Sequence, residues 1–176
     1  MNQYCIPIAI DLYPLIKDIR EYQRIPYQNV SVDNINPKLI SFFNELKISL
    51  IGFSIFYKPA SSLQIKPHSD FEGGDYVKLN FVYGGKNSKM IWYRVKNNIQ
   101  DHSTYITGNT GLHTSYNFSD VEKVYEHHVG CPSIVQVGVP HSILNTEEPR
   151  WCLSMVMVDD RGEKIPMQEI KNILQL

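Results

Sequence analysis

The spacing of apolar residues changes near residue 48 of the chain. Before that point Leu39, Ile40, Phe43 and Leu46 recur at helical intervals, which predicts a helix over roughly 37–47 that packs on a sheet. After it, the apolar runs are short, rich in β-branched and aromatic residues and bounded by turn residues, which is typical of strands. These runs predict strands at 48–57, 63–68, 77–83, 89–95, 134–139, 141–145 and 151–158.

Weaker patterns occupy the two ends of the chain. Residues 6–10 resemble a short strand, and residues 12–20 predict a helix with Pro14 in its first turn. Residues 22–34 are polar and interrupted by prolines, which favours a loop. The apolar residues of 166–176 share one helical side and predict a segment that packs on the outside.

Many short strands with helices mainly at the ends predict a mainly β protein with flanking helices. A double-stranded β-helix, also called a jelly roll and shared by cupins, is one such architecture. The length of 176 residues predicts a single domain, 1–176, with a β core at roughly 48–158.

Composition narrows the classes of function. A formal net charge of −1 gives no strong nucleic-acid signal, and no apolar run is long enough to predict a membrane span. No basic region precedes an apolar core at the N-terminus, so a signal peptide is not expected. The three cysteines lie far apart without zinc-like spacing, which favours a reducing, cytoplasmic location.

A histidine and an aspartate lie two residues apart at the end of the predicted strand 63–68. Side chains alternate along a strand, so His68 and Asp70 point to the same face. On one face they can bind a single divalent metal, as two of the three ligands of a 2-His-1-carboxylate site. His-x-Asp is a common tripeptide, so the pair predicts a metal site only if a second histidine joins it.

His141 is the candidate for that second histidine. It follows Pro140 at the head of a predicted strand, which defines its position at the rim of the sheet. Taken alone, a histidine is more often a surface or core residue than a ligand. His127 and His128 are adjacent, so on a strand they point apart and cannot both bind one metal.

Arg150 opens the last predicted strand, nine positions after His141, and shares a face with Cys152 and Ser154. A guanidinium on an inward face needs an anion, because a buried unpaired charge is very costly. A carboxylate bound through two hydrogen bonds is its best match. The alternative is an ion pair with a carboxylate of the chain itself, from Glu147, Glu148 or Asp159.

The order His68-x-Asp70, then His141, then Arg150, resembles the Fe(II)- and 2-oxoglutarate-dependent dioxygenase family. The resemblance covers roughly residues 48–158 and extends to short bacterial and phage members of the family. It rests on the segments Pro67-His68-Ser69-Asp70, Leu79-Asn80-Phe81, Ile91-Trp92-Tyr93 and Val139-Pro140-His141-Ser142-Ile143-Leu144-Asn145, and on Arg150.

The resemblance implies a hydroxylase that consumes O₂ and 2-oxoglutarate and releases succinate and CO₂. It implies iron held by His68, Asp70 and His141. It also implies that Arg150 binds the remote carboxylate of 2-oxoglutarate. Many members carry Ser or Thr two residues beyond this arginine, where this chain has Cys152. A facing strand would then supply the missing hydrogen bond, from Asn80 or Tyr57.

Lys78 and Asn80 share one face of the predicted strand 77–83, opposite Leu79 and Phe81. If the apolar face packs against the helices, Lys78 and Asn80 point inward toward the site. The opposite orientation would place both in solvent, and we expect the inward one for Asn80.

The segment 96–130 is polar and punctuated by glycines, which predicts an irregular, mobile insertion. Long loops on β scaffolds are often lids, although a surface loop without a role fits equally well. A lid would carry His102, Tyr105, His113, Tyr116, Asn117 and Phe118.

Two other classes of function stay open. A cupin-like metal-binding protein would use the same architecture without 2-oxoglutarate, with a further ligand and no need of Arg150. A β-rich structural or assembly domain would carry the histidines by chance. For an enzyme, the substrate is unidentified, and both a small molecule and a protein side chain are compatible with the sequence.

Overall fold

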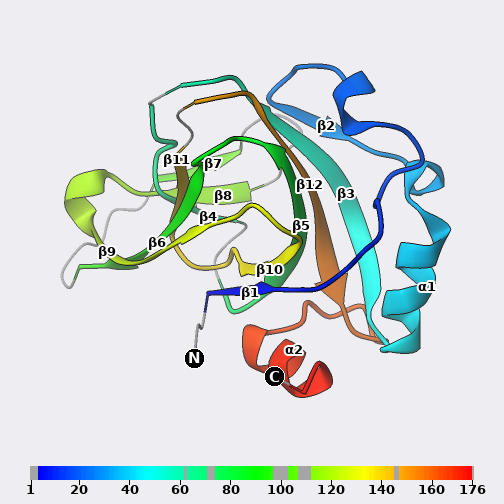
Figure 1. Ribbon diagram of the computed structural model, residues 1–176. Helices are drawn as coiled ribbons and strands as arrows, with labels where there is room; N and C mark the ends of the chain where they lie inside the picture. Colours follow the sequence, from blue (N-terminus) through cyan, green and yellow to red (C-terminus); the bar gives the residue numbers. More distant parts are fainter. Residues whose placement is uncertain are drawn as a thin grey trace.

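The computed structural model describes residues 4–61, 63–70, 74–96, 103–106, 112–144 and 147–175. The described strands form two antiparallel six-stranded sheets that pack as a β-sandwich, with two short α-helices outside them (Figure 1). None of the helices in these ranges is long and apolar enough to cross a membrane.

The first sheet contains, in spatial order, β1 (Cys5–Pro7), β10 (Ser133–Gln136), β5 (Val77–Gly84), β12 (Arg150–Val158), β3 (Ser49–Lys58) and β2 (Tyr27–Asn29). The second contains β7 (Ser103–Ile106), β8 (Leu112–Ser115), β4 (His68–Asp70), β11 (His141–Leu144), β6 (Lys89–Val95) and β9 (Val121–His128). Strands that are consecutive in the chain alternate between the two sheets from β3 to β6, and again from β10 to β12.

Every residue of β12 is buried, because both faces of the first sheet are covered. Trp151, Leu153 and Met155 lie in the largest apolar cluster, on the outer face of the sheet. The helices α1 (Pro37–Glu45) and α2 (Met167–Ile173) add apolar side chains to this cluster. Alternate residues of the same strand therefore face the second sheet, where the polar ones are found.

Between the sheets, a smaller apolar cluster fills only part of the sandwich. It combines Cys5 and Val135 of the first sheet with Met90 and Trp92 of the second. The Trp92 indole donates a hydrogen bond across the sandwich to the carbonyl oxygen of Gln136, at 2.8 Å. A cavity between the sheets is lined by residues of the candidate site.

Most of the regular elements predicted from the sequence are confirmed. The helix over 37–47 is α1, and six predicted strands correspond to β3, β5, β6, β10, β11 and β12. The terminal predictions are confirmed as β1 and α2. The strand predicted at 63–68 is wrong over most of its length, since β4 begins only at His68.

The helix predicted at 12–20 is also wrong. Leu15 pairs with Ile35 as an isolated β-bridge, and helical structure is limited to the 3₁₀-helix η1 (Ile19–Glu21). Asp18 caps this short turn by accepting a hydrogen bond from the Arg20 backbone N–H at 2.8 Å. The pairing of Leu15 with Ile35 has overridden the weak helical preference of this segment.

Two segments expected to be irregular contain regular structure. Residues 22–34 include β2 and the 3₁₀-helix η2 (Val32–Asn34). Within 96–130, β8 pairs with β4, and β9 pairs along β6. The polar composition of β9 is that of an edge strand, whose charged side chains pair with the neighbouring strand, as Glu126 does with Lys89 at 2.8 Å.

Candidate functional site

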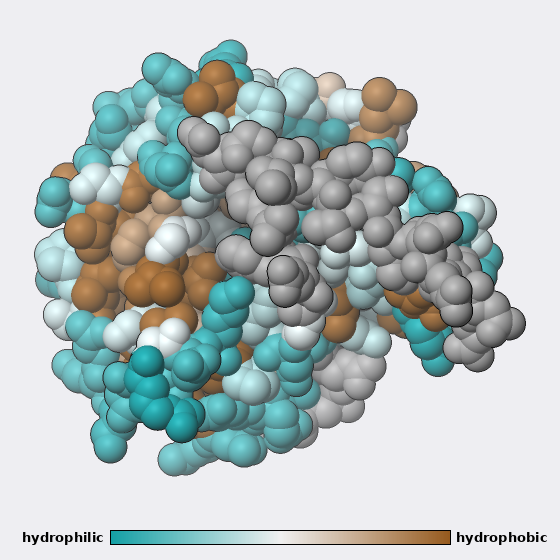
Figure 2. Space-filling view, turned by 180° about the vertical axis from the view of Figure 1, so that it is seen from behind, coloured by the Kyte–Doolittle hydropathy of each residue, from teal (hydrophilic) through white to brown (hydrophobic). Residues whose placement is uncertain are grey.

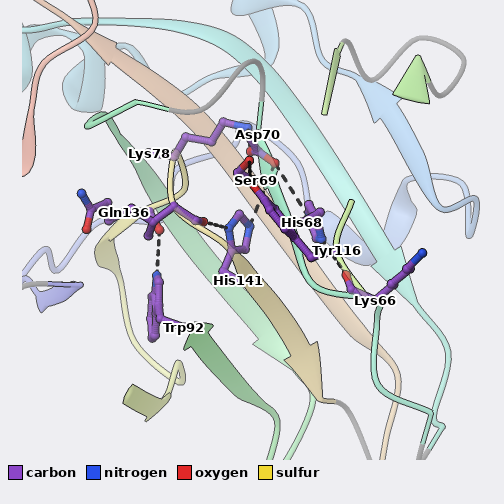
Figure 3. Close-up of polar contacts among 10 residues, drawn as sticks. Lys66, His68, Ser69, Asp70, Lys78, Trp92, Tyr116, Gln136 and His141 are labelled. Carbon is purple, nitrogen blue, oxygen red and sulfur yellow. Dashed lines mark hydrogen bonds and ion pairs between the residues drawn. The ribbon is translucent and has the colours of Figure 1, made fainter. Parts of the chain in front are cut away.

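His68, Asp70 and His141 come together at one end of the space between the sheets. His141 lies directly opposite His68 in the pairing of β11 with β4. Asp70 Oδ1 is 3.8 Å from His68 Nε2 and 4.0 Å from His141 Nε2. One ligand atom from each residue lies within 4.8 Å of the others, and Figure 3 shows the three side chains converging. The sequence-predicted cluster is therefore brought together.

Each imidazole is held by a backbone carbonyl on the side away from the cluster. His68 Nδ1 is 3.0 Å from the carbonyl oxygen of Lys66, and His141 Nδ1 is 2.9 Å from that of Val139. A carbonyl only accepts hydrogen bonds, so Nδ1 carries the proton in each ring and Nε2 keeps a free lone pair. Metal-binding histidines are usually oriented in this way.

The charges of the cluster suit a divalent cation. Burial alone would raise the pKa of Asp70, but Lys78, His141 and His68 outweigh it and lower this pKa to about 2. Burial, followed by the charge of His68, lowers the pKa of His141 to about 4. At neutral pH the site therefore offers an ionised carboxylate beside a neutral imidazole, the states that bind metal.

A cavity of about 350 Å³ extends from this cluster between the two sheets. Its wall combines side chains from β3, β5 and β12 of the first sheet with side chains from β4, β6 and β11 of the second. Pro59 and Ile65 line the cavity and are exposed, so they lie at its mouth. The lining residues used below are Tyr57, Lys58, Asp70, Lys78, Asn80, His141, Arg150 and Cys152.

The outer surface is mixed in character. Seen from behind, the molecule is mainly hydrophilic, with apolar side chains gathered mainly on the left of the view and scattered elsewhere (Figure 2). The exposed large apolar side chains include Leu63 and Ile65, which lie between β3 and β4. The chain near the cavity mouth is therefore partly apolar, and Ile65 itself lines the cavity.

Arg150 lines the same cavity and is only 5% exposed. Its Nε has no hydrogen-bond partner among the described residues, and none of their carboxylates lies within ion-pair distance of its guanidinium. The three alternative partners bind elsewhere: Glu147 to Lys86 and Asn87, Glu148 to the Lys86 backbone N–H, and Asp159 to Arg161. Burying a cation without an anionic partner is costly, so this environment favours an anion beside Arg150.

A second cation beside Arg150 was missed by sequence reasoning. Lys58 lies directly opposite Arg150 in the pairing of β3 with β12, and it lines the cavity. Its Nζ donates a hydrogen bond to the carbonyl oxygen of Leu63 at 3.0 Å. Burial and the nearby Arg150 lower the pKa of Lys58. The sequence signal for Lys58 was the strand predicted at 48–57. It corresponds to β3, but its predicted end lies one residue before Lys58.

The two residues expected to assist Arg150 are placed differently. Asn80 faces the cavity, and its buried Oδ1 has no partner among the described residues. Tyr57 also lines the cavity, but its ring packs on Trp151, with ring centroids 5.0 Å apart. The inward orientation expected for Asn80 is confirmed, and Lys78 faces the cavity with it.

Of the other described histidines, His113 borders the cluster, because it lies opposite Asp70 in the pairing of β8 with β4, whereas His127 and His128 lie on another strand. The His113 ring centroid on β8 is 5.8 Å from that of His68. His127 and His128 belong to the edge strand β9, and His128 Nδ1 contacts the carbonyl oxygen of Ser88 at 2.8 Å. His102 lies outside the described residues, as do the side chain of Tyr105 and the glycines at 108 and 111.

Comparison with known proteins adds no relative: no family model, no curated protein and no solved structure matches the chain. The argument for a function therefore depends on the geometry and charges of the site itself.

Proposed function

We propose that this protein is an Fe(II)- and 2-oxoglutarate-dependent oxygenase that hydroxylates a small molecule or a protein side chain. The observation that carries the proposal is the shared cavity. Asp70 and His141 of the 2-His-1-carboxylate cluster line it, and its wall also includes a buried arginine without an anion among the described residues. A bare metal-binding protein has no use for Arg150 in this position.

The donor set fits the metal that the proposal needs. Two imidazoles and one carboxylate on one side of Fe(II) leave coordination positions free for other ligands. His68, Asp70 and His141 would hold the iron, since their ligand atoms already lie within 4.8 Å of one another. Nδ1 of each histidine already contacts a backbone carbonyl, so the two rings would need little reorientation to bind the metal.

The topology supports the finer fold assignment. In a jelly roll, strands pass back and forth between two packed antiparallel sheets. The alternation of β3 to β6 and of β10 to β12 between the sheets follows this rule. We therefore propose a double-stranded β-helix of the type shared by cupins and these oxygenases.

In this proposal each part of the cavity has a distinct task. Arg150 binds the remote carboxylate of 2-oxoglutarate with two hydrogen bonds and so orients its 2-oxo acid end toward the metal ligands. The apolar side chains of Met90, Val137 and Ile143 line the cavity and limit the access of water. When bound, iron and 2-oxoglutarate supply the oxidising chemistry with O₂, and the chain supplies binding and orientation.

The direct test is an anaerobic titration of the Fe(II)-loaded protein with 2-oxoglutarate, following the visible absorption band that chelation of iron produces. We expect a saturable band, and succinate formation once O₂ is admitted. Arg150→Ala and Arg150→Met should weaken 2-oxoglutarate binding at least about tenfold, because a charge-assisted contact contributes about 1.5–3 kcal/mol. Arg150→Lys should restore only part, since an ammonium lacks the planar fork.

Metal binding separates the remaining classes. Stoichiometric Fe(II) binding without a band would favour the cupin-like protein, and no metal binding at all would favour the structural domain. If Arg150→Ala gives the band with unchanged affinity for 2-oxoglutarate, the protein is still an oxygenase, but another cation of the cavity binds the remote carboxylate. Lys78 would be tested first.

A further inference from the structure

Lys78 makes an ion pair with a candidate metal ligand from the opposite sheet. It extends from β5 of the first sheet, and its Nζ lies 2.6 Å from Asp70 Oδ2 on β4 of the second. The two side chains are 14% and 21% exposed, so the pair is largely shielded from water. Figure 3 shows Lys78 reaching the carboxylate across the cavity.

The pair divides the two oxygens of Asp70 between different partners. Oδ1 is the atom that approaches both histidines, at 3.8 and 4.0 Å. Oδ2 is the atom that accepts the hydrogen bond from Lys78. A carboxylate whose second oxygen is held by an ammonium presents one oxygen to a metal, whereas a free carboxylate can bind through both.

We propose that Lys78 is a positioning residue that keeps Asp70 a one-oxygen ligand and so reserves a coordination position for the chelating 2-oxo acid. The inference rests on the proposed function, because it needs a metal at His68, Asp70 and His141. With three protein donors, an octahedral ion has three positions left, two for the chelate and one for O₂. A second oxygen from Asp70 would occupy one of them.

Lys78 also acts on the metal through its charge. Its ammonium is a positive group bonded to a ligand of a cation, and like charges repel, most strongly where water is excluded. Lys78 therefore weakens metal binding while it protects the chelate. The two effects have opposite signs, which a purely structural ion pair would not produce.

Three variants separate the effect of the hydrogen bond to Asp70 from the effect of the positive charge. Lys78→Met removes both, Lys78→Gln keeps a hydrogen-bond donor without the charge, and Lys78→Arg keeps both. Lys89→Met is the matched control, because it removes a lysine–carboxylate pair with Glu126 on the surface of the second sheet. Mn(II) affinity of the metal-free protein is measured first, without any cosubstrate.

Chelation is then measured anaerobically on the Fe(II) proteins, with 2-oxoglutarate and with pyruvate. Pyruvate is a 2-oxo acid without the remote carboxylate, so its binding does not involve Arg150. Lys78→Met should bind Mn(II) several-fold more tightly and both 2-oxo acids about tenfold more weakly. Lys78→Gln should bind Mn(II) more tightly than the parent and bind both 2-oxo acids about as well. Lys78→Arg and Lys89→Met should resemble the parent in both measurements.

The outcomes distinguish this inference from the proposed function. Failure of the parent to bind metal would overturn both. The parent protein could bind metal and 2-oxoglutarate while Lys78→Met loses affinity for both. The ion pair would then have only a structural role, and this inference alone would be overturned. Unchanged chelation in Lys78→Met would also overturn it, since Asp70 would then need no restraint.

Discussion

Gly85 lies against the aliphatic part of Arg150, so closely that a methyl group on Gly85 would come within 2.8–3.0 Å of its Cβ, Cγ and Cδ atoms. Gly85 has a φ of +65° in the turn between β5 and β6. The turn therefore needs glycine for its conformation and also packs on the stem that carries the guanidinium. The position of the cation in the cavity depends on this contact.

Gly85→Ala should weaken 2-oxoglutarate binding, because the new methyl group must displace the Arg150 stem. Gly162→Ala is the matched control: Gly162 has a φ of +81°, and a methyl group there would meet nothing within 4 Å. Both variants should lose about 1 kcal/mol of unfolding free energy from left-handed backbone strain. Only Gly85→Ala should change the anaerobic 2-oxoglutarate titration, by about fivefold or more. Equal titrations for the two variants would contradict this prediction.

His68→Ala and His141→Ala should each abolish stoichiometric binding of Fe(II) or Mn(II). Each removes one of three donors, and the carbonyl of Lys66 or Val139 that orients the ring cannot replace it. Isothermal titration calorimetry with Mn(II) checks the result, and circular dichroism checks that the fold persists.

His127→Ala is the control for these two variants, because His127 is a partly exposed residue of the edge strand β9. It should bind Mn(II) like the parent. Parental Mn(II) binding in both His68→Ala and His141→Ala would exclude the cluster as the metal site.

The metal-free protein should lose stability as pH falls from about 6.5 toward 4. The pKa of His141 is lowered from 6.5 to about 4 on folding, so in this range the unfolded chain binds a proton that the folded protein does not. The loss should reach about 2 kcal/mol by pH 5. Asp70, with its pKa lowered from 3.8 to about 2, adds a further loss below pH 4.

Urea unfolding in the presence of a chelator, at pH 7 and pH 5, measures this slope. His141→Gln should remove most of it, since the amide does not titrate, and His127→Gln should leave it unchanged. A protein that gains stability between pH 7 and pH 5 would show that His141 is protonated in the folded state.

The sequence was sufficient to predict that His68 and Asp70 lie together, because strand geometry is local. Residues two apart on a strand share a face, so His68 and Asp70 follow from period-2 alternation alone. His141 joins them through the pairing of β11 with β4, which depends on contacts between residues far apart in the chain. Its identification from sequence needed a family resemblance in addition to the local pattern.

The cross-sheet contacts could not be predicted in the same way. Lys78 reaches Asp70 from the other layer, and Lys58 stands beside Arg150 through the register of β3 with β12. Sequence periodicity indicates which face a residue occupies, but not which residue of another strand lies opposite. For the same reason, the polar sequence of β9 predicts an irregular segment, whereas its place at the edge of a sheet is set by the partner β6.

Cys152 offers a test of how the remote carboxylate is held. Its buried side chain lines the cavity two residues beyond Arg150, and burial raises the pKa of its thiol, which therefore stays neutral. A thiol is a weak hydrogen-bond donor, whereas the Ser or Thr found here in many proteins of the resembled family is a strong one. Cys152→Ser should therefore tighten 2-oxoglutarate binding.

A hydrogen bond to a charged acceptor contributes about 1.5–3 kcal/mol, so the gain should be about tenfold or more in the anaerobic titration. The ligand-free variant should be less stable than the parent by about 1 kcal/mol, because a buried hydroxyl has lost its solvent. Cys152→Ala should lose stability without gaining affinity. Cys5→Ser, at a buried thiol of β1 in the smaller apolar cluster, should do the same. If Cys152→Ser binds 2-oxoglutarate no better than Cys152→Ala, the carboxylate does not approach residue 152. In that case Asn80→Ala should weaken 2-oxoglutarate binding.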